Sequence, residues 1–174
     1  PHRQNHNNET AMTSTAHRKE HVQQAADALI AAFASNDTDA YFAAFSEDAT
    51  FLFYTLPTPL LSRAAYREVW NGWQADGFAV IDCRSSNVTI SLQGDVAVFF
   101  HDVATHVRFG TEESHFHERE TIVFRHDGLD GWLVTSTCRR NRINRHVDRA
   151  SAPVERAASA FNHNKHNVSP ALTV

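Results

Sequence analysis

The chain has 174 residues, a formal net charge of −4 and 21% charged side chains. This length fits one domain with a hydrophobic core, and the slightly acidic balance without a basic stripe gives no reason to expect a nucleic-acid partner. Two cysteines are too few for a disulfide framework. No apolar run approaches the ~18 residues that a membrane span requires.

The two ends of the chain differ from its middle. Residues 1–16 are polar and show no periodicity, which predicts a disordered arm without the apolar core of a signal peptide. Residues 146–174 predict a polar tail that can form a short helix after Pro153. We therefore expect one folded domain over residues 17–145 and a cytoplasmic protein that contacts no membrane.

The first part of this domain predicts helices around one strand. The segment HRKEHVQQAADALIAAFASND has apolar residues at helical spacing, which indicates a long amphipathic helix. Asp37 or Thr38 can cap a second, short helix, and SEDATFLFYTL is typical of a strand. A further helix is predicted from an N-cap at Ser62 to a stop at Gly77.

From Phe78 the hydrophobic period changes to two, which indicates strands. Four segments follow it: FAVIDCRSSNVTISL, DVAVFFHDVATHVRF, HFHERETIVFRH and GWLVTSTCRRN. The connections QGD, GTEE and DGLDG have the composition of turns. Strands joined by hairpins pair antiparallel, so we expect an α+β fold with one antiparallel sheet and helices on one side of it.

This order of elements resembles the nuclear transport factor 2-like superfamily, and within it the SnoaL-like and calcium/calmodulin-kinase association-domain branch. The resemblance rests on NDTDAYFAAFSEDATF, GDVAVFF, RETIVFRHDG and DGWLV, and spans about residues 17–142. It implies a cystatin-like fold, in which a cone-shaped, curved antiparallel sheet wraps around the N-terminal helices and leaves a pocket at its open end. Members of the superfamily include isomerases, dehydratases, cyclases and non-catalytic domains, so the resemblance implies a pocket but not a reaction.

One feature of many relatives is missing. They have a His-x-His pair four and six residues after the tryptophan of the last strand, whereas those positions, counted from Trp132, are Ser136 and Cys138 here. Any chemistry that depends on those histidines is not carried over to this chain.

The segment HDVATHVRFGTEESHFHERET has four histidines, five acidic residues and two arginines. A turn centred on Gly110–Thr111 would place His106 opposite His115 and Asp102 opposite Arg119, and cross-strand partners share a face. That face would be apolar at one end and ionisable at the other, as expected for a pocket with an apolar closed end and a polar opening. We predict that it lines the pocket and that the opposite face packs in a dimer. The predicted pocket face comprises Val96, Val98, Phe100, Asp102, His106, His115, His117, Arg119, Thr121, Val123, Trp132, Val134, Ser136 and Cys138.

Enzymes of this superfamily place a carboxylate or histidine in a largely apolar pocket, where burial shifts its pKa towards the working pH. Here Asp102 could be held by Arg119 while His117 or His106 moves a proton, so these four are the predicted catalytic residues. The Asp102–Arg119 pair fits a purely structural cross-strand ion pair at least as well. Predicted ligand-binding residues are Tyr54, Tyr66, Trp70, Trp73, Phe100, His115, Thr121 and Ser136. Aromatic residues at helical spacing, such as Tyr66, Trp70 and Trp73, belong to a hydrophobic core more often than to a ligand site.

A metal site is the second interpretation of the histidines. Zinc or iron accepts His106, His115 and His117 together with Asp102 or Glu113. The branch that the chain resembles is not metal-dependent, however, and His-x-His also occurs on ordinary exposed strands. We therefore predict no metal, and the lack of a phosphate loop or dinucleotide fingerprint predicts no organic cofactor.

Together these features predict a SnoaL-like small-molecule pocket protein. If it is an enzyme, we expect a cofactor-free isomerase, cyclase or dehydratase that acts on a hydrophobic ring compound. The alternative is a non-catalytic ligand-binding or oligomerisation domain. The expected partners are a small hydrophobic ligand and a second copy of the chain that pairs through the sheet.

Overall fold

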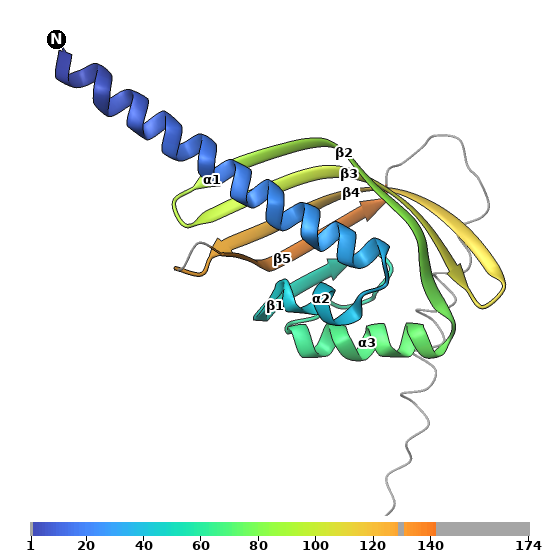
Figure 1. The fold of residues 1–174 in the computed structure, drawn as a ribbon. Helices are drawn as coiled ribbons and strands as arrows, with labels where there is room; N and C mark the ends of the chain where they lie inside the picture. Colours follow the sequence, from blue (N-terminus) through green and yellow to red (C-terminus); the bar gives the residue numbers. More distant parts are fainter. Residues whose placement is uncertain (1, 129–130, 142–174) are drawn as a thin grey trace, which may run out of the picture.

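The computed structural model describes the backbone of residues 2–128 and 131–141, with side chains from residue 14 onwards; the predicted tail over residues 146–174 lies outside these ranges. The described elements are, in chain order, α1 (His2–Ala34), α2 (Thr38–Ala43), β1 (Phe45–Phe53), α3 (Arg63–Ala75), β2 (Phe78–Gln93), β3 (Val96–Phe109), β4 (Glu112–His126) and β5 (Trp132–Asn141) (Figure 1).

The strands form one sheet in the order β1-β5-β4-β3-β2. Its curved shape and the helices packed against one face confirm the predicted α+β fold (Figure 1). The four hairpin-linked strands are antiparallel as predicted, but β1 pairs parallel with β5. A parallel pair needs a long crossover connection, and here α3 together with the meander β2–β4 supplies it.

The predicted register of the β3–β4 hairpin is confirmed. His106 pairs with His115 and Asp102 pairs with Arg119. Gly110 forms the turn with a φ of 59°, a conformation that favours glycine. The alternation of residues along the hairpin could therefore be worked out from the sequence.

The helices cover the sheet face opposite to the one predicted to line the pocket. We call the helix-covered face the inner face and the other the outer face. Both faces have ionisable side chains. On the outer face, three of them are exposed: His115, His117 and Arg119. On the inner face, His101 and Glu120 are buried. The inner face comprises Phe99, His101, Val103, Thr105 and Val107 of β3 with Phe116, Glu118, Glu120, Ile122 and Phe124 of β4.

A bulge in β5 corrects a second part of the face prediction. Val123 pairs with Ser136 and Phe124 with Val134, so Thr135 is an extra residue on β5. A bulge of this kind reverses the alternation of side chains beyond it. As a result Trp132 and Val134 are buried against the inner core, while Ser136 and Cys138 lie on the outer face.

Helix α1 begins at His2 and so includes most of the segment, residues 1–16, for which the sequence predicts a disordered arm. The segment from His2 to Ala34 contains no glycine or proline, and a helix that is already nucleated extends at little cost through such residues. Its C-terminal half is packed through Val22, Ala26 and Leu29. The N-terminal half projects beyond the sheet (Figure 1). No helix in the described part of the chain combines the length and the apolar character needed to cross a bilayer.

An aromatic core joins α2, α3 and β1. The ring centroids of Tyr41 and Trp70 are 5.2 Å apart, and Trp70 is fully buried with its Nε1–H donating to Thr38 Oγ1 at 3.1 Å. The predicted caps are also present, because the side chains of Asp37 and Ser62 accept hydrogen bonds from backbone N–H groups in the first turns of α2 and α3. Together with the ring contact of Phe51 on β1 with Tyr66 on α3, at 4.5 Å between centroids, these contacts hold the three elements together.

Gly77, which links α3 to β2, allows a close approach of two chain segments. It has a φ of 85°, and a Cβ added there would lie 2.8 Å from the backbone nitrogen of Gly110. We predict that Gly77→Ala lowers the free energy of unfolding by about 1–3 kcal/mol, because the added methyl group meets backbone and the φ is unfavourable. Urea denaturation would measure this change.

Gly72 provides the matched control, because it lies within α3 and an added Cβ would meet nothing within 4 Å. Gly72→Ala should raise the free energy of unfolding by roughly 0.5–1 kcal/mol through helix propensity alone. Equal effects of the two substitutions would contradict the role given to the Gly77–Gly110 approach.

Candidate active site

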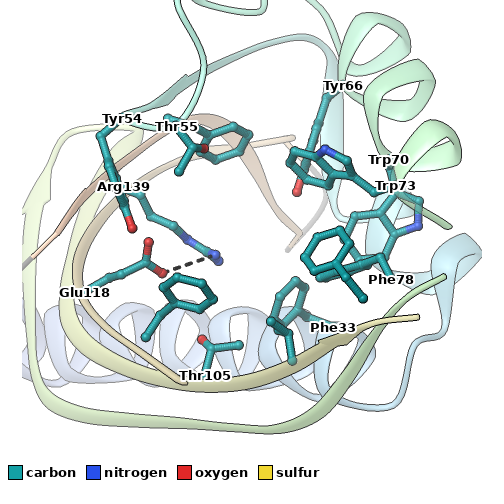
Figure 2. A pocket seen from close by; sticks show the side chains of 14 residues that line it. Phe33, Tyr54, Thr55, Tyr66, Trp70, Trp73, Phe78, Thr105, Glu118 and Arg139 are labelled. Carbon is teal, nitrogen blue, oxygen red and sulfur yellow. Dashed lines mark ion pairs between the residues drawn. The ribbon is translucent and has the colours of Figure 1, made fainter. Parts of the chain in front are cut away.

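A cavity of about 80 Å³ lies between the inner face, α1 and α3 (Figure 2). One buried water needs only ~10–15 Å³, so this space accepts several waters or part of a small organic molecule. Nine of its fourteen lining residues are aromatic. The lining consists of Phe33, Phe53, Tyr54, Thr55, Tyr66, Trp70, Trp73, Phe78, Thr105, Val107, Phe109, Phe116, Glu118 and Arg139.

Helix α3 supplies one wall, because Tyr66, Trp70 and Trp73 lie at positions i, i+4 and i+7 of the helix and so share a face. The predicted aromatic wall residues Tyr54, Tyr66, Trp70 and Trp73 all lie at the cavity. Trp70 is also part of the packed core. Contact of these side chains with a ligand stays a prediction.

The polar end of the cavity is an ion pair. Arg139 Nη1 lies 3.6 Å from Glu118 Oε2, and both side chains are largely buried (Figure 2). Burial raises the pKa of Glu118, and the negative charge of Glu120 adds to the rise; Arg139 and a hydrogen bond from Tyr54 oppose it without cancelling it. Glu118 is therefore a carboxyl group whose proton affinity is increased by its surroundings.

Glu120 differs from Glu118 because it is surrounded by donors. Thr137 Oγ1 donates to Glu120 Oε1 at 2.7 Å, and Arg139 Nε donates to the same oxygen at 3.1 Å. His101 Nε2 lies 3.0 Å from the other oxygen. Burial alone would raise the pKa of Glu120, but Arg139 and His101 hold it at about 2. Glu120 is therefore ionised and neutralises most of the charge of Arg139.

One of the cavity's lining residues, Tyr66, contacts a second tyrosine, Tyr41, which does not line the cavity. The hydroxyl oxygens of Tyr41 and Tyr66 are 3.2 Å apart. Burial raises the pKa of Tyr66 to about 12, so this phenol stays neutral. A neutral phenol can donate a hydrogen bond to an oxygen in the cavity.

This arrangement can transfer a proton. A carboxyl with raised pKa beside a fixed cation, inside apolar walls, is the combination that general acid–base catalysis requires. Sequence analysis missed Glu118 and Arg139 because it assigned their face to dimer packing. A signal was present in the sequence, since Val103, Ile122 and Phe124 make the inner face bulkier than the outer face around these charges.

The four predicted catalytic residues lie on the outer face. Asp102 Oδ1 accepts from Arg119 Nε at 2.9 Å, which confirms the predicted pair, and Asp102 Oδ2 also accepts from Asn87. His117 is exposed.

His106 belongs to a different contact on the same face. Its Nε2 lies 2.8 Å from Glu113 Oε2, and its ring stacks on His115 with centroids 3.9 Å apart. The two imidazoles are thus held against each other rather than aimed at a common point.

The outer-face residues line neither the aromatic cavity nor the smaller cavity behind it, because the helices enclose both cavities on the other side of the sheet. Within the ranges that the structure describes, histidine, cysteine, aspartate and glutamate side chains form no group of three or more that could hold a metal ion. The predicted residues without a place at either cavity are His117, His106, Asp102, Arg119, Phe100, His115, Thr121 and Ser136.

Residues 22–136 match the model of the SnoaL-like domain. No curated protein matches the chain significantly. Solved structures with the same fold include a protein of unknown function from Mycobacterium tuberculosis, with a TM-score of 0.69 and 14% identity over 87% of this chain and 90% of that one. Another, from Novosphingobium aromaticivorans, is named as a candidate scytalone dehydratase; its TM-score is 0.66, with 15% identity over 79% of this chain and 93% of that one. The CaMKII hub of S. rosetta is similar with a TM-score of 0.57 and 19% identity over 71% of this chain and 95% of that one.

Arg139 should be essential for stability. We predict that Arg139→Met lowers the free energy of unfolding by about 3–5 kcal/mol, because it leaves Glu118 and Glu120 buried without their cation. Arg125→Met is the matched control: Arg125 pairs with Asp48 at 3.2 Å, but the two side chains are 50% and 67% exposed. That substitution should cost less than about 1 kcal/mol. Similar losses in urea denaturation would show that the buried cluster has no special role.

Glu118 should make stability depend on pH. Its pKa is raised in the folded chain, so the folded state holds this proton more tightly than the unfolded state does. The free energy of unfolding therefore falls as pH rises from the unfolded pKa, near ~4.3, towards the raised folded pKa. The side chain in Glu118→Gln cannot ionise, so the variant does not lose this stability. The free energy of unfolding of the variant minus that of the wild type should therefore rise over this pH interval and stay constant above the folded pKa. A difference that does not vary between pH 3 and 8 in urea denaturation would contradict this.

Proposed function

The chain belongs to the SnoaL-like domain family, and from this premise we propose that it is a small-molecule pocket protein performing cofactor-free acid–base chemistry on a hydrophobic ring compound. The observation that supports the proposal is the Glu118–Arg139 ion pair at one end of an otherwise aromatic cavity. Nine aromatic lining residues favour a flat or cyclic molecule. The Glu118–Arg139 pair gives such a molecule one polar end to bind.

In the proposed reaction, ionised Glu118 removes a proton from a carbon next to a carbonyl group. Arg139 and Tyr54 stabilise the negative charge that develops on the carbonyl oxygen. Protonated Glu118 can then return the proton in three ways. Returned to another carbon of the same enolate, it completes an isomerisation; returned to the alkoxide oxygen that forms when the enolate carbon attacks a second carbonyl group of the molecule, it completes a cyclisation. Returned to a hydroxyl that leaves as water, it completes a dehydration. The N. aromaticivorans neighbour named as a candidate scytalone dehydratase supports the dehydration branch.

The outer face supports a second role, that of an assembly surface. Phe100 is 38% exposed there, between the ion pair of Asp102 and the apolar end of the sheet. We propose that two copies pair through this face. The sequence predicts the opposite assignment, with the outer face in the pocket and the inner face in the dimer. The likeness to a CaMKII hub supports oligomerisation of this fold. A purely non-catalytic binding or oligomerisation domain is therefore the alternative function.

A reducing compartment fits the two thiols. Cys83 and Cys138 are both free and partly buried, and unpaired thiols are typical of cytosolic proteins. We accordingly propose a cytoplasmic location.

Deuterium exchange into a small ketone tests the catalytic proposal. With 2-tetralone in D₂O, the protein should accelerate the loss of the C1 protons above the buffer rate, followed by ¹H NMR. Glu118→Gln should reduce this acceleration about 100-fold or more, since a general base typically contributes 10²–10⁴-fold. Quenching of tryptophan fluorescence by 2-tetralone should persist in the variant, because the aromatic walls remain.

The outcomes separate the alternatives. Binding of 2-tetralone without any acceleration would favour the non-catalytic interpretation. Loss of exchange in His117→Ala or Asp102→Asn, with exchange retained in Glu118→Gln, would move the chemistry to the predicted outer-face residues. Native mass spectrometry of the fresh protein would show a retained ligand and a dimer, and Phe100→Glu should convert that dimer to monomer if the outer face is the interface.

A further inference from the structure

Four ionisable side chains form what we call the inner charge cluster: the buried Glu118, Glu120 and His101, and the partly buried Arg139. Arg139 contacts both carboxylates, at 3.6 Å to Glu118 and 3.1 Å to Glu120. On the sheet, His101 pairs with Glu120, while Val103 pairs with Glu118. His101 and Glu118 are therefore diagonal neighbours on one face, and the backbone positions of such neighbours are roughly 7–8 Å apart.

His101 reaches solvent through a serine. It is 2% exposed and does not line the aromatic cavity. Its Nε2 faces Glu120 at 3.0 Å, and its Nδ1 lies 2.8 Å from the hydroxyl oxygen of Ser85 on the edge strand β2. A cavity of about 20 Å³ is lined by both His101 and Arg139, and this is enough for one water. A proton can therefore reach the buried imidazole from the edge of the sheet.

The cluster is one positive charge short. If His101 is neutral and both carboxylates are ionised, the one guanidinium leaves a net charge of −1 in a buried site, which is costly. Glu120 accepts from Arg139 and Thr137 and faces His101, so it stays ionised. One further proton restores neutrality, and either Glu118 or His101 can take it.

We infer that His101 is a positioning residue that controls whether Glu118 is charged, because the two side chains share one proton across Glu120 and Arg139. A proton on His101 leaves Glu118 as an ionised base; a neutral His101 leaves Glu118 as an acid. Charges within one buried cluster affect each other strongly, because the protein interior screens them less than water does. The pair therefore titrates as a unit.

The other polar groups around the cluster do not compete for this proton. Burial raises the pKa of the Cys83 thiol on β2, and Tyr41 on α2 and Tyr66 on α3 also have raised pKa values, so all three are neutral near pH 7. Tyr54 hydrogen bonds to Glu118 without taking its proton. From α1, the side chains lining the two cavities are apolar: Leu29, Ile30 and Phe33.

The experiment is a ¹³C NMR titration of the side-chain carboxyl of Glu118 in the full chain. In His101→Gln the amide can keep both hydrogen bonds, to Glu120 and to Ser85, but cannot carry the proton. We expect the Glu118 midpoint to rise by about one unit in this variant and to follow a single step, because the competing acceptor is gone. His17→Gln, an exposed histidine on α1, should leave the midpoint unchanged.

Ser85→Ala keeps the inference testable if His101→Gln does not fold. It removes the partner of Nδ1, which disfavours the protonated imidazole, so the Glu118 midpoint should again rise, by a smaller amount. An unchanged midpoint in the folded variants would overturn the inference. A wild-type His101 whose ¹⁵N shifts show no protonation between pH 4 and 9 would overturn it as well.

The inference deepens the proposed function, in which Glu118 is the base, but the titration needs no substrate. A shifted midpoint without any exchange of 2-tetralone would retain the coupling and reject the acid–base function. Where exchange does occur, the acidic limb of its pH profile should move up by the same amount in His101→Gln. A merely structural role for His101 would lower activity without moving that limb.

Discussion

The guanidinium of Arg139 is held between two carboxylates and a phenyl ring on the inner face of the sheet. It contacts Glu118 and Glu120 and lies 5.4 Å from the ring centroid of Phe33 on α1. A buried ion pair is weak evidence for stability, since desolvation offsets much of the attraction. Arg139 instead links β5, β4 and α1 at one point. It also leaves one of the two carboxylates, Glu118 at the cavity, incompletely neutralised.

That imbalance explains why two glutamates separated by one residue behave differently. Glu120 receives hydrogen bonds from neighbouring strands and is a fixed anion, whereas Glu118 faces aromatic walls and has a higher proton affinity. The alternation of a strand puts both on the same face, and only their different neighbours separate their roles. A family fold supplies the cavity, and such local differences decide what it can do.

Local rules predicted much of this structure. The caps at Asp37 and Ser62 and the register of the His106–His115 hairpin follow from residue types and alternation alone. The face that lines the cavity was predicted wrongly, because both faces mix apolar and ionisable residues. The bulkier apolar residues of the inner face are a small difference in the sequence, and the packing of the helices makes it decisive. The bulge at Thr135 and the parallel pairing of β1 depend on contacts between distant segments, and a single sequence has no local signal for either.

The approach of Gly77 to Gly110 also fixes one side of the cavity rim. Gly110 N donates to Gly77 O at 3.1 Å, and the rings of Phe78 and Phe109 next to them are 4.9 Å apart. These contacts hold the two lining residues Phe78 and Phe109 next to each other. The segment between β1 and α3 is joined to the sheet by the Phe51–Leu60 bridge and by the hydrogen bond of Tyr54 to Glu118. The rim of the cavity is therefore held on two sides, by the glycine contact and by this segment.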